Sequence, residues 1–213
     1  GIRGRRLCEV GCSYGGFLRL ARAKAAEVCG LEPDQNAVAH LRRMGIPIVP
    51  PEGGESDKDI VCAFQVLEHL IAPGRMVQRV ARMLAQDGRF LLSIPNGDEA
   101  VKAGPTWIGY RVDLEHLNYF NLKTLGLLFA RNGILVEQYW EWAQPGVLRP
   151  AEPVGTRFSR IFARLKRSRM AGPLLHWGDG RFELVVLARK CSRPAGELDA
   201  SRKESGGGYA ARG

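Results

Sequence analysis

The sequence lacks any uninterrupted apolar run that approaches the roughly 20 residues needed to span a bilayer. Its first residues also lack the apolar core of a secretory signal peptide. The five cysteines form an odd set without a Cys-x-x-Cys pair, which argues against structural zinc and against a disulfide framework. We therefore expect a soluble, cytoplasmic protein whose cysteines are reduced thiols that serve as small core residues.

What the sequence contains is typical of one globular domain. It has 213 residues, of which 45% are hydrophobic and 25% charged, and domains of this size bury a full core. Lysine and arginine outnumber aspartate and glutamate by 31 to 22, for a formal net charge of +9. The composition excludes a disordered chain, a collagen and a coiled coil.

Short apolar runs alternate with stretches of helical periodicity up to about residue 95. We expect strands at residues 7–10, 27–31, 46–49, 59–64 and 89–94, with helices after the first, second and fourth of them. Strands that alternate with helices in this way form a parallel sheet with right-handed crossovers. The sequence therefore predicts a doubly wound α/β fold.

The alternation changes after residue 96. A helix at 122–131 precedes two late strands at 134–139 and 181–188, which are joined by a long insertion and predict an antiparallel hairpin at one edge of the sheet. We assign residues 1–190 to one domain with a basic amphipathic insertion at about 145–177. The polar segment 191–213 is expected to be a disordered tail.

The stretch Gly-Cys-Ser-Tyr-Gly-Gly at residues 11–16 joins the first strand to the first helix. A glycine turn at this place lets backbone N–H groups approach a polar ligand closely. Glu32 follows the second strand about 20 residues later, where a carboxylate can accept two ribose hydroxyls. The loop alone fits a dinucleotide, S-adenosylmethionine or a turn without a ligand.

Further motifs follow this loop in order. Glu9 lies two residues before Gly11, and the segments at 59–70, 83–96 and 116–120 come after it. Together they resemble the seven-stranded S-adenosylmethionine-dependent methyltransferases, in particular the branch that includes ubiquinone-biosynthesis O-methyltransferases. The resemblance covers roughly residues 7–188 and implies S-adenosylmethionine as cofactor. It also implies a mostly parallel seven-stranded sheet in the order 3-2-1-4-5-7-6, with the seventh strand antiparallel.

The resemblance implies a set of cofactor contacts. The loop under the methionine part of the cofactor would consist of Glu9, Gly11, Cys12, Ser13 and Gly15. Glu32 would hold the ribose, Pro33 and Asp34 would flank the adenine, and Gln65 and Val66 would lie beside the sulfonium. Ser13 departs from the family, which usually has glycine there. The acidic residue that often follows the third strand has no clear equivalent at residues 50–56.

Methyl transfer requires a positioned nucleophile and a group that takes its proton, and histidine is the natural base near neutral pH. His69 lies just beyond the fourth expected strand and His116 in the segment after the fifth, with Asp113 and Glu115 as nearby orienting groups. We name His69 and His116 as candidate catalytic residues. Helix capping or packing is the alternative role for each.

Some relatives carry Glu-x-x-Glu-His at this point and bind a divalent metal with it and a later histidine. Here the stretch is Gln-Val-Leu-Glu-His at residues 65–69, so that Gln65 replaces the first carboxylate. Because an amide is a weaker ligand for a hard cation, we expect no metal.

Seven basic residues and one acid between Arg149 and Arg169 account for six of the nine net charges. A helix here would carry Phe158, Ile161, Phe162 and Leu165 on one face and the arginines on the other. It fits a packed amphipathic helix, a lid, or a peripheral membrane contact through residues 156–170. A nucleic-acid partner is not expected, because no aromatic residues interleave the basic stripe.

The sequence thus predicts S-adenosylmethionine-dependent methyl transfer to a small-molecule or lipid-linked acceptor, at oxygen. A catalytically silent, methyltransferase-like binding domain is the first alternative, and a dinucleotide-dependent oxidoreductase is the second. The chain opens at the first strand, whereas helices commonly precede it in this family, which favours a fragment or one domain of a longer chain. The oligomeric state is not indicated.

Overall fold

The computed structural model describes residues 1–50, 57–103, 116–142, 148–150 and 183–191. Asp113, Glu115, most of the basic insertion and the expected disordered tail beyond residue 191 lie outside the described residues. No helix in the described ranges has the length and the apolar composition of a membrane-spanning segment.

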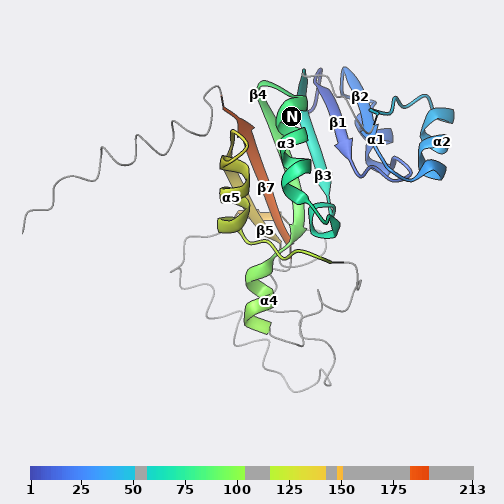
Figure 1. Cartoon of the computed structure of the whole chain (residues 1–213). Coiled ribbons are helices and arrows are strands. Elements are labelled where there is room, and N and C mark those ends of the chain that lie inside the picture. The colour runs from blue at the N-terminus through green and yellow to red at the C-terminus, as the bar shows by residue number, and fades with distance from the viewer. Residues whose placement is uncertain (51–56, 104–115, 143–147, 151–182, 192–213) are drawn as a thin grey trace, which may run out of the picture.

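The described strands form a single sheet in the order β2-β1-β3-β4-β7-β5-β6 (Figure 1). Their bounds are β1 (Arg6–Val10), β2 (Glu27–Leu31), β3 (Lys58–Phe64), β4 (Leu84–Pro95), β5 (Ile134–Trp142), β6 (Leu148–Pro150) and β7 (Glu183–Lys190). The first four pair in parallel, whereas β7 runs antiparallel to both β4 and β5. The predicted parallel sheet with a late antiparallel hairpin is confirmed.

The expected order of seven strands is not confirmed. Residues 46–49 form a single parallel bridge between Gly30 and Ile48 in place of the third strand. The flanking Pro47 and Pro50 have no N–H to donate to a ladder, so pairing is confined to two hydrogen bonds around Gly30. At the opposite edge, the short strand β6 pairs with β5 and was not predicted.

Helices cover both faces of the sheet, as a doubly wound fold requires. The short α1 (Gly16–Ala21) and α2 (Gln35–Arg43) bury Leu18 and Leu41 against one face. On the other face, α3 (Pro73–Met83) and α5 (Leu122–Ala130) bury Val77, Val80 and Phe129 (Figure 1). A short 3-10 helix, η1 (Leu67–His69), follows β3, and α4 (Gly97–Ala103) follows β4.

Local signals set the helix starts. Asp34 accepts a hydrogen bond from the Asn36 N–H at 2.8 Å and caps α2. Asn121 and Thr124 cap α5 reciprocally. These side chains give partners to the Asn36 N–H in α2 and to the Asn121 and Thr124 N–H groups at the start of α5.

The cysteines have the expected state. All five are free thiols, and Cys8, Cys12, Cys29 and Cys62 are buried in the core. Burial, the largest cause, raises the pKa of the Cys12 thiol to about 12, so this thiol is not ionised at neutral pH.

Gly30 tests the packing between the first loop and the sheet. A Cβ at Gly30 would lie 2.4 Å from Cys12 Sγ and 3.2 Å from Leu18 Cδ1. We expect Gly30→Ala to lower the free energy of unfolding by about 1–3 kcal/mol, because this part of the core has no room for a methyl group. Urea denaturation measures the change.

Gly126→Ala in α5 is the matched control. No atom lies within 4 Å of a Cβ built there. Alanine should stabilise this helix by about 0.5–1 kcal/mol. If Gly30→Ala is as stable as the wild type, the described contact between Gly30 and Cys12 is wrong.

Candidate functional site

The expected site residues gather at the carboxyl ends of the parallel strands. Glu9 lies in β1 and the glycine loop follows it, Glu32 follows β2, and Gln65 and Val66 follow β3. In open α/β sheets this edge is where ligands bind.

The loop after β1 has the backbone conformation that glycine favours. Gly11, Ser13 and Gly15 have φ angles of 68°, 47° and 77°. A Cβ on Gly11 would lie 2.6 Å from Val66 Cγ2, so the loop contacts the residue after β3 closely. Ser13 adopts a left-handed conformation that a side chain makes unfavourable. The glycines therefore let the loop pack closely against Val66 and Leu41.

Glu32 connects this loop to the end of β2. Its Oε2 accepts the Ser13 N–H at 2.7 Å and its Oε1 accepts the Asp34 N–H at 3.0 Å. Each carboxylate oxygen can accept more than one hydrogen bond, so both remain able to accept a ribose hydroxyl. Glu32 is half-buried and fits the expected role.

Two other expected residues contribute less through their side chains. The Cys12 side chain is buried, and a Cβ on Gly30 would meet its Sγ. Only the backbone of Cys12 is therefore available to a ligand at the loop. Pro33 is exposed beside Asp34, at the start of α2.

Glu9 is buried beneath the loop, with no cationic side chain beside it among the described residues. Only 6% of the residue is exposed, and no described residue hydrogen-bonds to its Oε2. Burial is the first cause that raises the pKa of this carboxyl to about 7, and the charge of Glu32 is the second. A positively charged ligand at the loop would stabilise the ionised form of this carboxylate.

The structure brings the two candidate catalytic histidines together. The ring centroids of His69 and His116 lie 4.7 Å apart in an edge-to-face arrangement. The backbone N–H groups of Leu117 and Asn118 donate to the Glu68 carbonyl, and the Asn118 side chain donates to the Leu70 carbonyl. The segment after α4 is thereby tied to the 3-10 helix η1.

Glu68 completes this cluster and was not predicted as a site residue. It is 1% exposed, and neither carboxylate oxygen has a hydrogen-bond partner in the described part of the chain. Burial, the main cause, raises the pKa of its carboxyl to about 7. Its position next to His69 is the sequence signal that could have identified it.

Glu68, His69 and His116 place one ligand atom each within 4.8 Å of one another. Such a group can share a proton, since a carboxylate beside an imidazole stabilises its charged form. The same three atoms form a donor set for a divalent cation. The arrangement therefore supports acid–base chemistry and defines where a metal would have to bind.

Gln65, the residue before Val66, lies in a second polar cluster. Its φ is 55°, and its side-chain Nε2 donates to Ser93 Oγ and to Glu183 Oε1, both at 3.1 Å. Ser93 Oγ also donates to Glu183 Oε1. Sequence analysis identified neither Ser93 nor Glu183.

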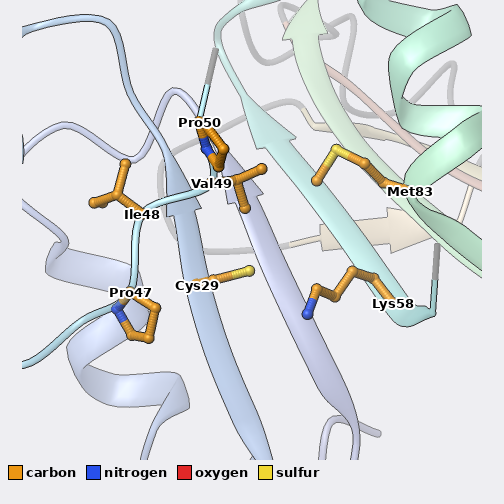
Figure 2. A pocket seen from close by; sticks show the side chains of 7 residues that line it. All are labelled: Cys29, Pro47, Ile48, Val49, Pro50, Lys58 and Met83. Atoms are coloured by element: carbon orange, nitrogen blue, oxygen red, sulfur yellow. The ribbon is translucent and has the colours of Figure 1, made fainter. Parts of the chain in front are cut away.

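A pocket of about 200 Å³ lies away from these residues (Figure 2). Its lining consists of Cys29, Pro47, Ile48, Val49, Pro50, Lys58 and Met83. The pocket contains none of the predicted site residues, and most of its lining is apolar. It is therefore not the site that the sequence predicts.

The buried carboxyl of Glu9 predicts a pH dependence of stability. Its pKa in the folded protein is about 7, above the ordinary value of 4.5, so the folded state holds the proton more tightly than the unfolded chain. The resulting stabilisation is fully present below pH 4.5 and is lost as the pH rises through 7. Relative to Glu9→Gln, the wild type should therefore lose up to about 3 kcal/mol between pH 5 and pH 8. Denaturation of both proteins across this range measures it, and a difference independent of pH would contradict the raised pKa.

Comparisons with known proteins found methyltransferases. A "Probable S-adenosylmethionine-dependent methyltransferase" of Mycolicibacterium smegmatis is 36% identical over 101 residues, which cover 44% of this chain and 39% of the relative. The chain thus spans less than half the length of that relative. The ubiquinone biosynthesis O-methyltransferase of Proteus mirabilis is 26% identical over 174 residues, which cover 76% of this chain and 68% of the relative.

A solved structure shares the fold. The S-adenosylmethionine-dependent methyltransferase from Mesorhizobium loti superposes with a TM-score of 0.61 at 18% identity, over 89% of this chain and 92% of that one. Residues 1–139 also match the family described as "Methyltransferase domain". This match covers more than half of the chain and includes the glycine loop, Glu32 and both histidines, so the chain belongs to the methyltransferase domain family.

Proposed function

We propose that this domain transfers the methyl group of S-adenosylmethionine to a hydroxyl of a small-molecule or lipid-linked acceptor. The observation that carries the proposal is the His69–His116 pair beside buried Glu68, at the same sheet edge as the glycine loop. The names of the mycobacterial and Proteus relatives support the cofactor and the oxygen. We also propose that the domain belongs to the branch of the family that includes the ubiquinone-biosynthesis O-methyltransferases.

The cofactor part of the site follows from the loop. Glu32 would accept the ribose hydroxyls while Pro33 and Asp34 flank the adenine. Glu9 lies buried below the loop, and its Oε2 has no hydrogen-bond partner among the residues that the structure describes. It would lie near the positively charged part of the cofactor. When bound, S-adenosylmethionine supplies an electrophilic methyl group and a neutral thioether leaving group.

The histidines would serve the acceptor. One of the two imidazoles accepts the hydroxyl proton as the oxygen attacks the methyl carbon. The carboxyl group of Glu68 stabilises the imidazolium that results, because it is buried within reach of both rings. His69 and His116 are therefore proposed as the proton acceptors and Glu68 as their electrostatic partner.

The surroundings of the histidine pair support an acceptor with an apolar portion. Ile71, Leu117 and Tyr119 are exposed and lie within three residues of His69 or His116 in the sequence. Exposed apolar side chains close to a site are the kind of group that an apolar ligand contacts. A membrane contact through residues 156–170 is part of this proposal, and these residues lie outside the described part of the chain. The proposal includes no nucleic acid.

Glu32 tests the cofactor assignment. Glu32→Ala removes charge-assisted hydrogen bonds to the ribose and the acceptor for the Ser13 N–H, so affinity for S-adenosylmethionine should fall about tenfold or more. Calorimetry measures the affinity. Glu27→Ala is the matched control. Glu27 is the first residue of β2, the strand that Glu32 follows, and it is exposed at the opposite end of that strand.

The result separates three interpretations. Equal affinity of Glu32→Ala and wild type would remove Glu32 from the cofactor site. Binding of NAD in a thermal-shift assay, without binding of S-adenosylmethionine, would favour the oxidoreductase. Tight binding of S-adenosylmethionine without turnover of any acceptor would favour the silent binding domain.

The histidines test the chemistry. We expect His69→Ala or His116→Ala to lower methyl transfer by about 10²-fold or more, since general base catalysis contributes on this scale. Formation of S-adenosylhomocysteine is measured with small catechols and with a detergent-dispersed polyprenyl phenol as acceptors. His40→Ala, on α2, is the control and should retain full activity.

The same assay tests the expectation that no metal takes part. EDTA and added Mg²⁺ or Zn²⁺ should change neither the melting temperature nor the rate. A rise in melting temperature with one of these cations that disappears in His116→Ala would show that the cluster binds metal. Full activity of both histidine variants would contradict their role as bases.

A further inference from the structure

Three polar side chains, from the ends of neighbouring strands, form a cluster beside the loop. Gln65 follows β3, Ser93 lies in β4, and Glu183 begins the antiparallel strand β7. Gln65 Nε2 donates to Glu183 Oε1 at 3.1 Å, and Ser93 Oγ donates to the same oxygen. Glu183 is 118 residues from Gln65 in the sequence, so only the order of the sheet brings them together.

The carboxylate is held in a fixed position. Ser93 is 5% exposed, and its carbonyl accepts the Gln65 N–H at 2.8 Å. The Gln65 amide is therefore held by its backbone as well as by Ser93 Oγ. Oε1 of Glu183 has two donors, whereas its Oε2 has no hydrogen-bond partner in the described parts of the chain.

Both donors to Glu183 are neutral groups. Neither an amide nor a hydroxyl compensates the negative charge of a carboxylate. The two side chains that hold Glu183 therefore leave its negative charge uncompensated, which favours a positively charged ligand beside it.

Val66 shows where this cluster lies relative to the glycine loop. Val66 comes directly after Gln65, and its side chain fills the space that a Cβ on Gly11 would need. The cluster therefore borders the loop on the side of β3, while Glu32 borders it on the side of β2. A ligand that reaches from Glu32 across the loop would place its far end near Gln65 and Glu183.

We propose that Gln65, Ser93 and Glu183 form a carboxylate subsite for the sulfonium of S-adenosylmethionine, which lets the protein bind this cation more tightly than the neutral product. The inference rests on the proposed function. In the reaction the S–CH₃ bond breaks and the O–CH₃ bond forms. Sulfur keeps the electron pair and the hydroxyl proton passes to a histidine, so the cofactor becomes an uncharged thioether. The attraction to Glu183 is then lost, which favours exchange of product for a new cofactor.

Calorimetric titrations with S-adenosylmethionine and S-adenosylhomocysteine test the subsite without any acceptor. Glu183→Gln keeps the size of the side chain and one oxygen that can accept both hydrogen bonds, and it removes the charge. We expect this variant to bind S-adenosylmethionine about tenfold more weakly and S-adenosylhomocysteine less than twofold more weakly. The ratio of the two affinities is the readout, because a purely structural role would change both alike.

Glu137→Gln is the matched control. Glu137 is a carboxylate in β5 that pairs with Arg89 and Arg189 at the other end of the sheet. This variant should bind both ligands as the wild type does. Glu183→Asp keeps the charge and should keep the wild-type ratio, whereas Glu183→Ser should lose it, so the test holds even if one substitution destabilises the fold.

The outcomes are distinct. An equal loss for both ligands in Glu183→Gln would place Glu183 near a group that the two share and would overturn the subsite. An unchanged ratio would overturn it as well. Failure of the wild type to bind either ligand would instead contradict the proposed function.

Discussion

Burial of two carboxyl groups is the constraint on which this site depends. Glu9 and Glu68 are almost completely buried, and oxygens of both lack hydrogen-bond partners among the described residues. An unpaired buried charge is costly, so each carboxyl group either holds a proton at neutral pH or needs a positive charge nearby to stabilise its ionised form. Burial raises the pKa of both carboxyls to about 7, so their charge can respond to what binds. A methyl donor with a sulfonium is a ligand of the required sign.

The parallel sheet is what brings these acids to one edge. Glu9 lies near the end of β1, Glu68 follows β3 by four residues, and both belong to the carboxyl side. The core on the two faces holds the strands in register, with α1 and α2 on one side and α3 and α5 on the other. The antiparallel strand β7 starts at this edge, so its first residue, Glu183, joins the same set.

The sequence predicts those parts of the site that depend on local order. The glycine loop, Glu32 and His69 all lie close after the ends of apolar runs, and the structure places them at one edge. His116 lies farther along the chain and reaches this edge because Leu117 and Asn118 hydrogen-bond to residues 68 and 70. Glu183 could not be predicted in this way, because its contact with Gln65 depends on β7 pairing with β4 across a gap of 118 residues. The third strand was predicted from its apolar residues, and it failed because Pro47 and Pro50 interrupt the hydrogen-bond ladder.

Ser13 shows how a departure from the family pattern can be accommodated. A serine with a φ of 47° is strained relative to glycine, so a degraded loop would be expected to relax toward another conformation. Instead, its backbone N–H donates to Glu32, which also accepts the Asp34 N–H at the start of α2. The strain at Ser13 is thus opposed by a charge-assisted hydrogen bond of about 1.5–3 kcal/mol. Glu32 and the loop therefore form one unit, in which the left-handed conformation of Ser13 is compensated by a hydrogen bond rather than relaxed.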